Sequence, residues 1–182
     1  DCLGKNGKKF SYFPILIKLI DARDDLSVQV HPNDEYALKV EGEYGKTEMW
    51  YIVDCEEGAA LYYGFKEEIS KEEFRKKIAD NTITDVLNRV PVKKGDVFFI
   101  PSGTIHAIGR GILIAEIQQN SNTTYRVCDY GRLGADGRPR RVHIDYAVEV
   151  TNLAPPPESK DLSAGTLAEC EYFKVRLFST DT

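Results

Sequence analysis

A glycine and a proline at fixed spacing constrain the middle of this chain more than any other feature does. In KKGDVFFIPSGTIHAIG, Gly95 is followed by Pro101, then by Gly103, and three positions later by His106. Gly95 allows a turn before the apolar run, and the Pro-x-Gly sequence turns the chain sharply after it. The segment therefore predicts a strand, a tight turn and a second strand that presents His106 to the interior.

Short strand-like segments recur along most of the chain. Runs of β-branched and aromatic residues bounded by turn residues predict strands, and many such strands at regular spacing favour an all-β barrel or sandwich. The predicted strands cover 14–20, 26–32, 47–55, 59–65, 96–101, 111–119, 123–131 and 140–150.

A small helical insertion interrupts this pattern. Asn33 is a favourable N-cap residue, and Ser70 with Glu73 forms a capping box at the start of a second helix. The predicted helical segments cover 33–42, 70–81 and, for one or two turns, 83–90.

The C-terminal part has a different composition. Residues 154–160 are rich in proline and read as a linker. We expect residues 1–153 to form the core domain, and residues 161–182 to begin a second β domain that is cut short. The chain starts at Asp1 without a methionine, which indicates an incomplete N-terminus.

Composition excludes some classes of function. The net charge of −5 argues against a nucleic-acid partner. No apolar run approaches the roughly 20 residues that span a bilayer. The four cysteines have no CxxC spacing, which is typical of free thiols in a reducing cytoplasm. The oligomeric state is left open.

The spacing G-x5-P-x-G-x2-H resembles the second conserved motif of cupins, which are jelly-roll β-barrels that hold one metal. The first cupin motif usually places histidines and a glutamate close together, and here Gln29 and His31 share one face of a strand and Glu48 follows the insertion. With His106 they offer two imidazoles, a carboxylate and an amide oxygen, a set that suits zinc. Taken singly, each also has a structural interpretation as a turn, strand or surface residue.

Four segments make the resemblance more specific. LSVQVHPNDEYA, GKTEMWYIV, IPSGTIHAIG and AEIQQNSNTTYRVCDYGR resemble, in order, the signature segments of the type I mannose-6-phosphate isomerase family, in its short bacterial form. The resemblance covers about Pro14 to Leu153. It implies an all-β cupin-type barrel with one Zn²⁺ per chain and a phosphosugar substrate, and the interconversion of mannose 6-phosphate and fructose 6-phosphate through a cis-enediol.

The resemblance also implies roles for single residues. Arg126 would lie beside the reacting carbons and Lys46 at the pocket edge, with Ser27 and Glu116 lining the site. Arg132 and Lys46 are candidates for the phosphate, because cationic donors bind phosphate oxygens well. The implied metal ligands are Gln29, His31, Glu48 and His106.

The general base stays open at this point. Arg126 is always charged, so it suits stabilisation of the enediolate better than proton removal. Glu116, Lys46 and a hydroxide on the metal all remain candidates, and Glu116 is slightly favoured. His143 is interpreted as a strand residue with a hydrogen bond and not as a metal ligand.

Two other functions fit the same residues less well. A non-haem iron dioxygenase would favour a histidine where Gln29 stands. A non-catalytic cupin that binds a sugar or an anion is the other alternative. The sequence also departs from the family pattern at Asn33 and Asn122, where aspartate is common, and is shorter than family members.

Overall fold

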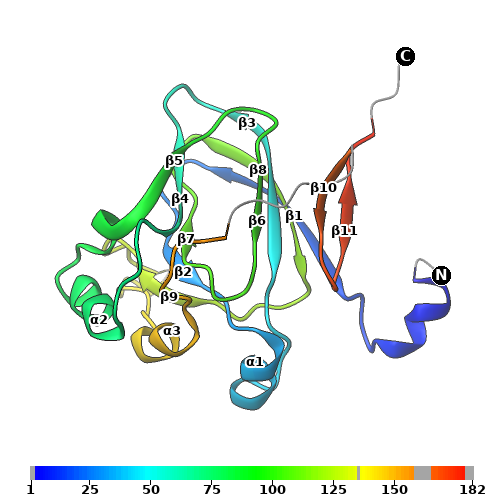
Figure 1. Cartoon of the computed structure of the whole chain (residues 1–182), viewed down its shortest axis with the longest axis horizontal. Helices are drawn as coiled ribbons and strands as arrows, with labels where there is room; N and C mark the ends of the chain where they lie inside the picture. Colours follow the sequence, from blue (N-terminus) through cyan, green and yellow to red (C-terminus); the bar gives the residue numbers. More distant parts are fainter. Residues whose placement is uncertain (1–2, 135, 158–164, 179–182) are drawn as a thin grey trace.

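Two antiparallel sheets face each other and carry most of the chain (Figure 1). The computed structural model describes residues 3–134, 136–157 and 165–178. One sheet has the order β1-β8-β3-β6, formed by Ile15–Ala22, Ile112–Gln119, Glu48–Cys55 and Val97–Ile100. The other has the order β5-β4-β7-β2-β9, formed by Leu87–Pro91, Ala60–Phe65, His106–Ala107, Val28–Val30 and Tyr125–Cys128. The all-β, cupin-type fold predicted from the sequence is confirmed.

The space between the sheets is apolar at one end and polar at the other. Trp50, Ile52 and Ile114 of the four-stranded sheet pack with Leu61 of β4 in the apolar part. A second core lies on the outer face of the five-stranded sheet, where Val28 and its neighbours contact the helices. The two cores hold the sheets in place around the polar end, which contains the candidate site.

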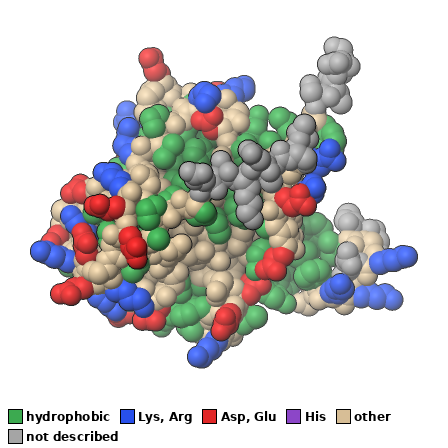
Figure 2. Space-filling model, viewed as in Figure 1, with side chains coloured by type: hydrophobic (Ala, Val, Ile, Leu, Met, Phe, Trp, Pro, Cys, Tyr) green, Lys and Arg blue, Asp and Glu red, His purple; other side chains and the backbone are tan. Residues whose placement is uncertain are grey.

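Three short α-helices of the described residues lie outside the sheets. They are α1 (Asp34–Val40), α2 (Lys71–Ala79) and α3 (Ile144–Val150), and two 3-10 segments cover Gly4–Lys9 and Ile83–Val86. The predicted caps are confirmed, since Asn33 accepts a hydrogen bond from Tyr36 N–H and Ser70 accepts one from Glu73 N–H. Figure 2 shows that charged side chains crowd the side of the molecule that carries α2, at left.

Three local predictions need correction. Residues 140–150 were expected to form a strand, but Ile144–Val150 is helix α3, because this segment buries Ala147 and Val148 against the second core. The helical segment expected at 83–90 is a single 3-10 turn, and strand β5 begins at Leu87. Strand β2 is also shorter than expected, so His31 follows the strand directly.

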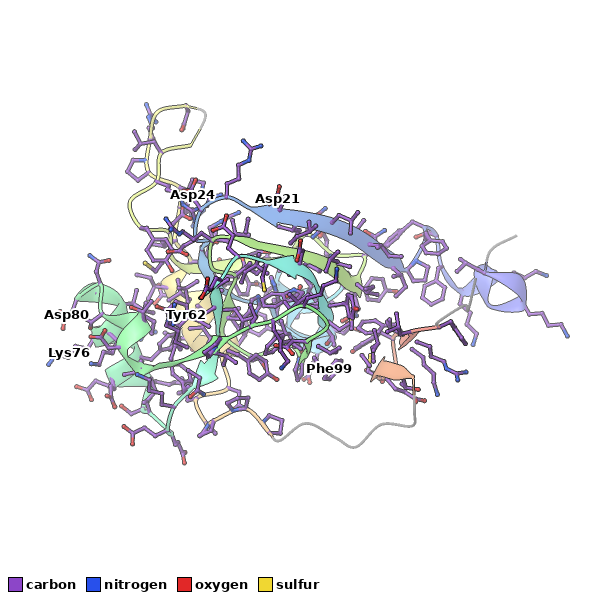
Figure 3. All side chains as sticks on the ribbon, turned by 90° about the horizontal axis from the view of Figure 1, so that it is seen from above. Asp21, Asp24, Tyr62, Lys76, Asp80 and Phe99 are labelled. Atoms are coloured by element: carbon purple, nitrogen blue, oxygen red, sulfur yellow. The ribbon has the colours of Figure 1, made fainter. Side chains whose placement is uncertain are left out.

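The described residues after the proline-rich segment form a hairpin. Strand β10 (Thr166–Glu169) pairs with β11 (Lys174–Arg176) in a separate two-stranded sheet. Phe173 of the hairpin meets Phe99 of β6 edge-on, with the ring centroids 6.5 Å apart. Seen from above, Phe99 lies on the side of the molecule next to this hairpin (Figure 3). The end of the predicted linker, residues 158–160, and part of the predicted second domain, residues 161–164 and 179–182, lie outside the described residues.

Candidate metal centre

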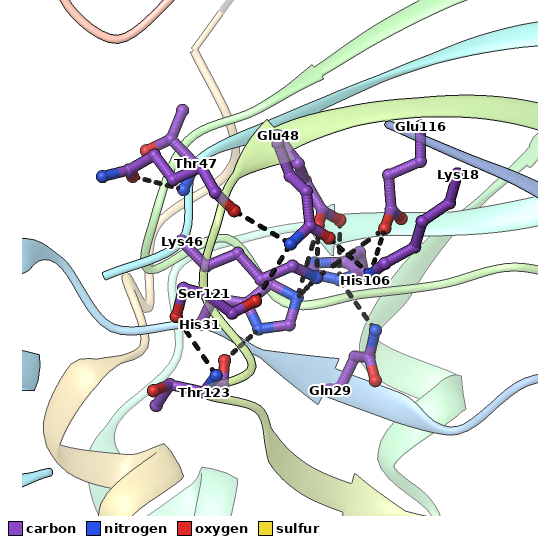
Figure 4. Close-up of polar contacts among 12 residues, drawn as sticks. Lys18, Gln29, His31, Lys46, Thr47, Glu48, His106, Glu116, Ser121 and Thr123 are labelled. Carbon is purple, nitrogen blue, oxygen red and sulfur yellow. Dashed lines mark hydrogen bonds and ion pairs between the residues drawn. The ribbon is translucent and has the colours of Figure 1, made fainter. Parts of the chain in front are cut away.

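Three of the four expected metal ligands meet at the polar end of the barrel (Figure 4). One ligand atom of each of His31, Glu48 and His106 lies within 4.8 Å of the others, and all three side chains are buried. Glu48 begins β3 of one sheet, while His106 begins β7 of the other and His31 follows β2. The packing of the two sheets against each other therefore brings together residues that are far apart in the sequence. No histidine is visible on the face in Figure 2.

Backbone carbonyls fix the protonation of both imidazoles. Nδ1 of His31 lies 2.9 Å from the carbonyl oxygen of Thr123, and Nδ1 of His106 lies 2.8 Å from that of Thr104. A carbonyl can only accept, so the proton of each neutral ring is on Nδ1. The lone pair of each Nε2 then faces Glu48, at 3.6 Å for His31 and 3.4 Å for His106. This is the tautomer and orientation that a metal-binding histidine needs.

Burial shapes the titration of this cluster. It lowers the pKa of His106 to about 4 and lowers the pKa of His31 well below its usual value. Both rings are therefore neutral near pH 7 and keep their lone pairs. Burial raises the pKa of Glu48, and the adjacent Lys46 ammonium opposes that rise.

The ammonium of Lys46 lies among the ligand atoms. Its Nζ is 2.6 Å from Oε2 of Glu48 and 3.0 Å from Nε2 of His31. Among the described residues no hydrogen bond satisfies either oxygen of Glu48, so the ion pair with Lys46 is their main compensation. The Lys46 ammonium, itself a cation, thus occupies the point where the acceptor atoms of Glu48 and His31 converge.

The donor set fits a divalent metal. Two neutral imidazoles and one buried carboxylate whose oxygens have no hydrogen-bond partner, held at short mutual distance, are the ligands that zinc and similar ions take. Gln29 lies beside them, with its Nε2 3.4 Å from Nε2 of His106 and its Oε1 3.3 Å from the Ser27 hydroxyl. The structure therefore brings together three residues that could hold a metal ion, and the fourth ligand stays a prediction.

A second carboxylate lies next to the trio. Oε1 of Glu116 is 3.0 Å from Nζ of Lys18, and Oε2 accepts a hydrogen bond of 2.8 Å from the indole of Trp50. Burial acts to raise the pKa of Glu116, but the ammonium groups of Lys46 and Lys18 outweigh it and the net shift is downward. Glu116 is therefore ionised near pH 7.

Lys18 and Trp50 were not among the predicted site residues. Their positions follow from sheet register, because Lys18 and Trp50 both pair with Glu116, on β1 and β3 respectively. A lone lysine in the apolar run ILIKLI was the available signal in the sequence. The side chain of Lys18 remains 37% exposed, so the cluster reaches solvent at this residue.

A loop contact holds the segment that carries Lys46 and Glu48. The carboxylate of Asp34 accepts hydrogen bonds from Gly45 N–H and from the Gln119 side chain. Gln119 in turn accepts a hydrogen bond from Thr47 N–H, between the two functional residues. The start of α1 and the end of β8 thus fix the entry to β3.

Arg126 lies on the same face of the five-stranded sheet as Gln29 and His106. It pairs with Gln29 across β9 and β2, while its neighbours Tyr125 and Val127 point into the helix-covered core. Side chains alternate along a strand, so the side chain of Arg126 is directed between the sheets with that of Gln29.

Arg132 is held elsewhere by an acidic partner. Its Nη2 lies 2.6 Å from Oδ1 of Asp129, and Arg140 pairs with the same carboxylate. The two guanidinium groups outweigh burial and lower the pKa of Asp129. No contact joins Arg132 to the buried cluster among the described residues, so the structure does not bring this predicted phosphate ligand to the metal centre.

The chain is similar to proteins named as mannose-6-phosphate isomerases. A family profile described as phosphomannose isomerase type I, catalytic domain, matches residues 3–61. Mannose-6-phosphate isomerase ManA of Bacillus subtilis is 49% identical over 172 residues, which are 90% of this chain and 54% of that protein. The mannose-6-phosphate isomerase of Streptococcus mutans is 51% identical over 148 residues, or 81% of this chain and 46% of that protein.

A solved structure agrees with these sequence matches. The mannose 6-phosphate isomerase of Bacillus subtilis superposes with a TM-score of 0.81 at 42% identity, over 91% of this chain and 55% of that one. The chain thus spans about half the length of the curated relatives it matches. Over this half, the sequence and the fold of the chain are both similar to those of type I phosphomannose isomerases.

Proposed function

We propose that this chain carries the catalytic centre of a zinc-dependent mannose-6-phosphate isomerase, with one zinc per chain. The observation that carries the proposal is the buried trio His31, Glu48 and His106, whose ligand atoms lie within 4.8 Å of one another. The names of its relatives support an aldose–ketose isomerase over the dioxygenase and the non-catalytic cupin. We further propose a cytoplasmic location. None of the helices in the described part of the chain is long and apolar enough to cross a bilayer.

His31, Glu48 and His106 would hold the metal, with Gln29 as the proposed fourth ligand. When bound, zinc supplies a Lewis acid that polarises the carbonyl and hydroxyl oxygens of the sugar. Mixed imidazole and carboxylate ligands are common at catalytic zinc sites. The chain's own contribution is to keep both imidazoles neutral and correctly oriented.

Glu116 is the proposed base for the proton that moves between C2 and C1. It is ionised near pH 7, and its carboxylate is held in place by Lys18 at Oε1 and by the indole of Trp50 at Oε2. A lowered pKa makes it a weaker base than one poised near neutrality. The positive charges of Lys46 and Arg126 compensate, because they stabilise the negative charge that develops on the enediolate oxygens.

The phosphate group would be bound near the solvent-exposed end of the site. Lys18, Lys46 and Arg126 supply cationic groups on the inner faces of the two sheets. Ser27 offers a hydroxyl beside Gln29. Arg132 remains a proposed contact only if a substrate competes with Asp129 for its guanidinium.

Metal content and activity should be measured on one sample. We expect about one zinc per chain by elemental analysis, and formation of fructose 6-phosphate from mannose 6-phosphate in a coupled assay. His106→Ala should lose both. A metal-loaded chain without activity would refute the isomerase proposal for this chain, and absence of any bound metal from metal-supplemented protein would refute the site.

A further inference from the structure

Arg126 lies on the edge strand of the five-stranded sheet. Within the described part of the chain, strand β9 pairs with β2 on one side and with no strand on the other. Backbone N–H and C=O groups on an open edge need another partner or water. At Arg126 the partner is a single residue of the segment that precedes α3.

His143 satisfies both open backbone groups of Arg126. The backbone N–H of His143 donates to the carbonyl oxygen of Arg126 at 2.8 Å. The N–H of Arg126 donates to Nδ1 of His143 at 3.2 Å. The imidazole therefore takes the place that a carbonyl of a neighbouring strand would occupy.

This arrangement requires a neutral imidazole with its proton on Nε2. Burial lowers the pKa of His143, and the like charges of Arg126 and Arg141 lower it further, against a smaller opposite effect of Glu41. The ring also lies against Tyr125, with the centroids 6.1 Å apart. The acceptor on Nδ1 is thus preserved near pH 7.

The side chain of Arg126 has no comparable support. Its Nε is buried without a hydrogen-bond partner, and no ion pair within the described residues engages its guanidinium. Where an arginine is held by a carboxylate, that pair fixes its direction. At Arg126 the direction of the guanidinium depends on the position of the backbone, and His143 and β2 hold that backbone from opposite sides.

We propose that His143 is a positioning residue for Arg126, which it holds by the two backbone hydrogen bonds so that the guanidinium faces the sugar oxygens beside the metal. The proposal rests on the isomerase function proposed above and adds a residue that lies outside the metal cluster. His143 itself contacts neither the metal ligands nor, on this proposal, the substrate.

Two substitutions of His143 distinguish the effect of its hydrogen bond to Arg126 N–H from the effect of its ring shape. His143→Phe keeps a planar ring but removes the acceptor for Arg126 N–H, whereas His143→Asn keeps an acceptor close to the position of Nδ1. We expect His143→Phe to lower kcat about tenfold with little change in KM, since small misplacement of a catalytic group is costly in the transition state. His143→Asn should recover most of that loss, and equal loss in both variants would overturn the proposal.

A double-mutant cycle tests whether the effect passes through Arg126. If it does, His143→Phe should cause little further loss in an Arg126→Ala background, because the group that it positions is then absent. The same fold-loss in both backgrounds would contradict the proposal and indicate a general effect on folding. Circular dichroism and the melting temperature of each variant provide the folding control.

Amide exchange separates this inference from the isomerase proposal. The Arg126 N–H should exchange with solvent slowly in the wild type and in His143→Asn, and at least about tenfold faster in His143→Phe. Equal exchange in wild type and His143→Phe would overturn the inference whether or not the chain is an isomerase. An inactive wild type with the expected exchange pattern would refute the isomerase proposal and support the anchoring of Arg126.

Discussion

Lys46 occupies an unusual position for a buried ammonium group. It is only 4% exposed, and it is close to two atoms that a metal would also need, Oε2 of Glu48 and Nε2 of His31. A buried charge is tolerated only when it is paired. The residue therefore compensates the carboxylate in the metal-free chain and opposes a second cation at the same point.

We predict that Lys46→Met binds zinc more tightly than the wild type while it loses activity. Removal of the ammonium relieves its repulsion of the metal, and the enediolate loses a stabilising charge, which is worth roughly 100-fold in rate. Competition with a chelator of known affinity gives the zinc affinity, and the coupled assay gives kcat. A variant with weaker zinc binding would contradict the view that Lys46 competes with the metal.

His143 gives the chain a predicted pH dependence. Its pKa is lowered in the folded chain, from 6.5 toward lower values, so the folded chain binds this proton less readily than the unfolded chain. The stability that depends on neutral His143 is complete above pH 6.5 and is lost as the pH falls below it. Urea unfolding at two pH values on either side of 6.5 should show a larger loss for wild type than for His143→Asn, and equal losses would contradict the assignment.

Single residues were easier to predict than their neighbours in space. The spacing of Gly95, Pro101, Gly103 and His106 limited the local backbone enough to identify one metal ligand candidate from sequence. Trp50, by contrast, reaches Glu116 only because β3 and β8 pair in one particular register. Such long-range pairing is set by the packing of the whole sheet, and no local pattern reports it.

At the scale of elements, α2 shows how far local signals suffice. Its cap residue Ser70 and its apolar residues Phe74 and Ile78 were all visible in the sequence, and the structure has the helix where they predict it. Helix α3 was missed because its alternating valines and isoleucine resemble a strand. Contact with the core on the outer face of the five-stranded sheet outweighs that propensity.

Ser70→Ala should weaken α2 without affecting the metal centre. The variant removes the hydrogen bond from Glu73 N–H, at a cost of about 1 kcal/mol. Helix α2 packs on the outer face of the five-stranded sheet, whereas the candidate metal ligands lie between the sheets. Urea unfolding and elemental analysis should therefore show lower stability and unchanged zinc content, and loss of zinc would contradict this separation.

The loop before β3 should not tolerate a side chain at Gly45. A Cβ on Gly45 would lie 2.4 Å from the carbonyl carbon of Asn33 and 2.6 Å from the carbonyl oxygen of Pro32. Gly45→Ala must therefore displace the backbone that carries Lys46, and we expect a loss of about 1–3 kcal/mol together with weaker zinc binding. Gly58→Ala is the control, since its Cβ meets no atom within 4 Å and only the φ of +76° is unfavourable. Equal zinc binding in the two variants would contradict the role of this contact.

At the scale of the whole molecule, the polar end of the four-stranded sheet has an inverted pattern. Its inner face carries Lys18, Glu48 and Glu116, whereas Ile17 and Leu19 on the outer face of β1 are 67% and 75% exposed. A sheet with one solvated face usually places its apolar residues inward. Here the barrel interior is divided between an apolar core and a polar site, and the boundary between them is formed by Trp50.

Trp50 makes the state of the metal centre measurable in the intact chain. It is the single tryptophan of the sequence, meets the ring of His106 edge-on at 5.3 Å between centroids, and donates to Glu116. We predict that zinc changes its fluorescence with a stoichiometry of about one per chain, because His106 and the charges around Glu116 respond to the bound ion. At free zinc about 100-fold above Kd, the free energy of unfolding should rise by about 2.7 kcal/mol, and a chelator should reverse both effects.

His106→Ala should show neither change. A full fluorescence response in that variant would mean that zinc binds at a different place, and the role of this cluster in the chemistry would have to be abandoned.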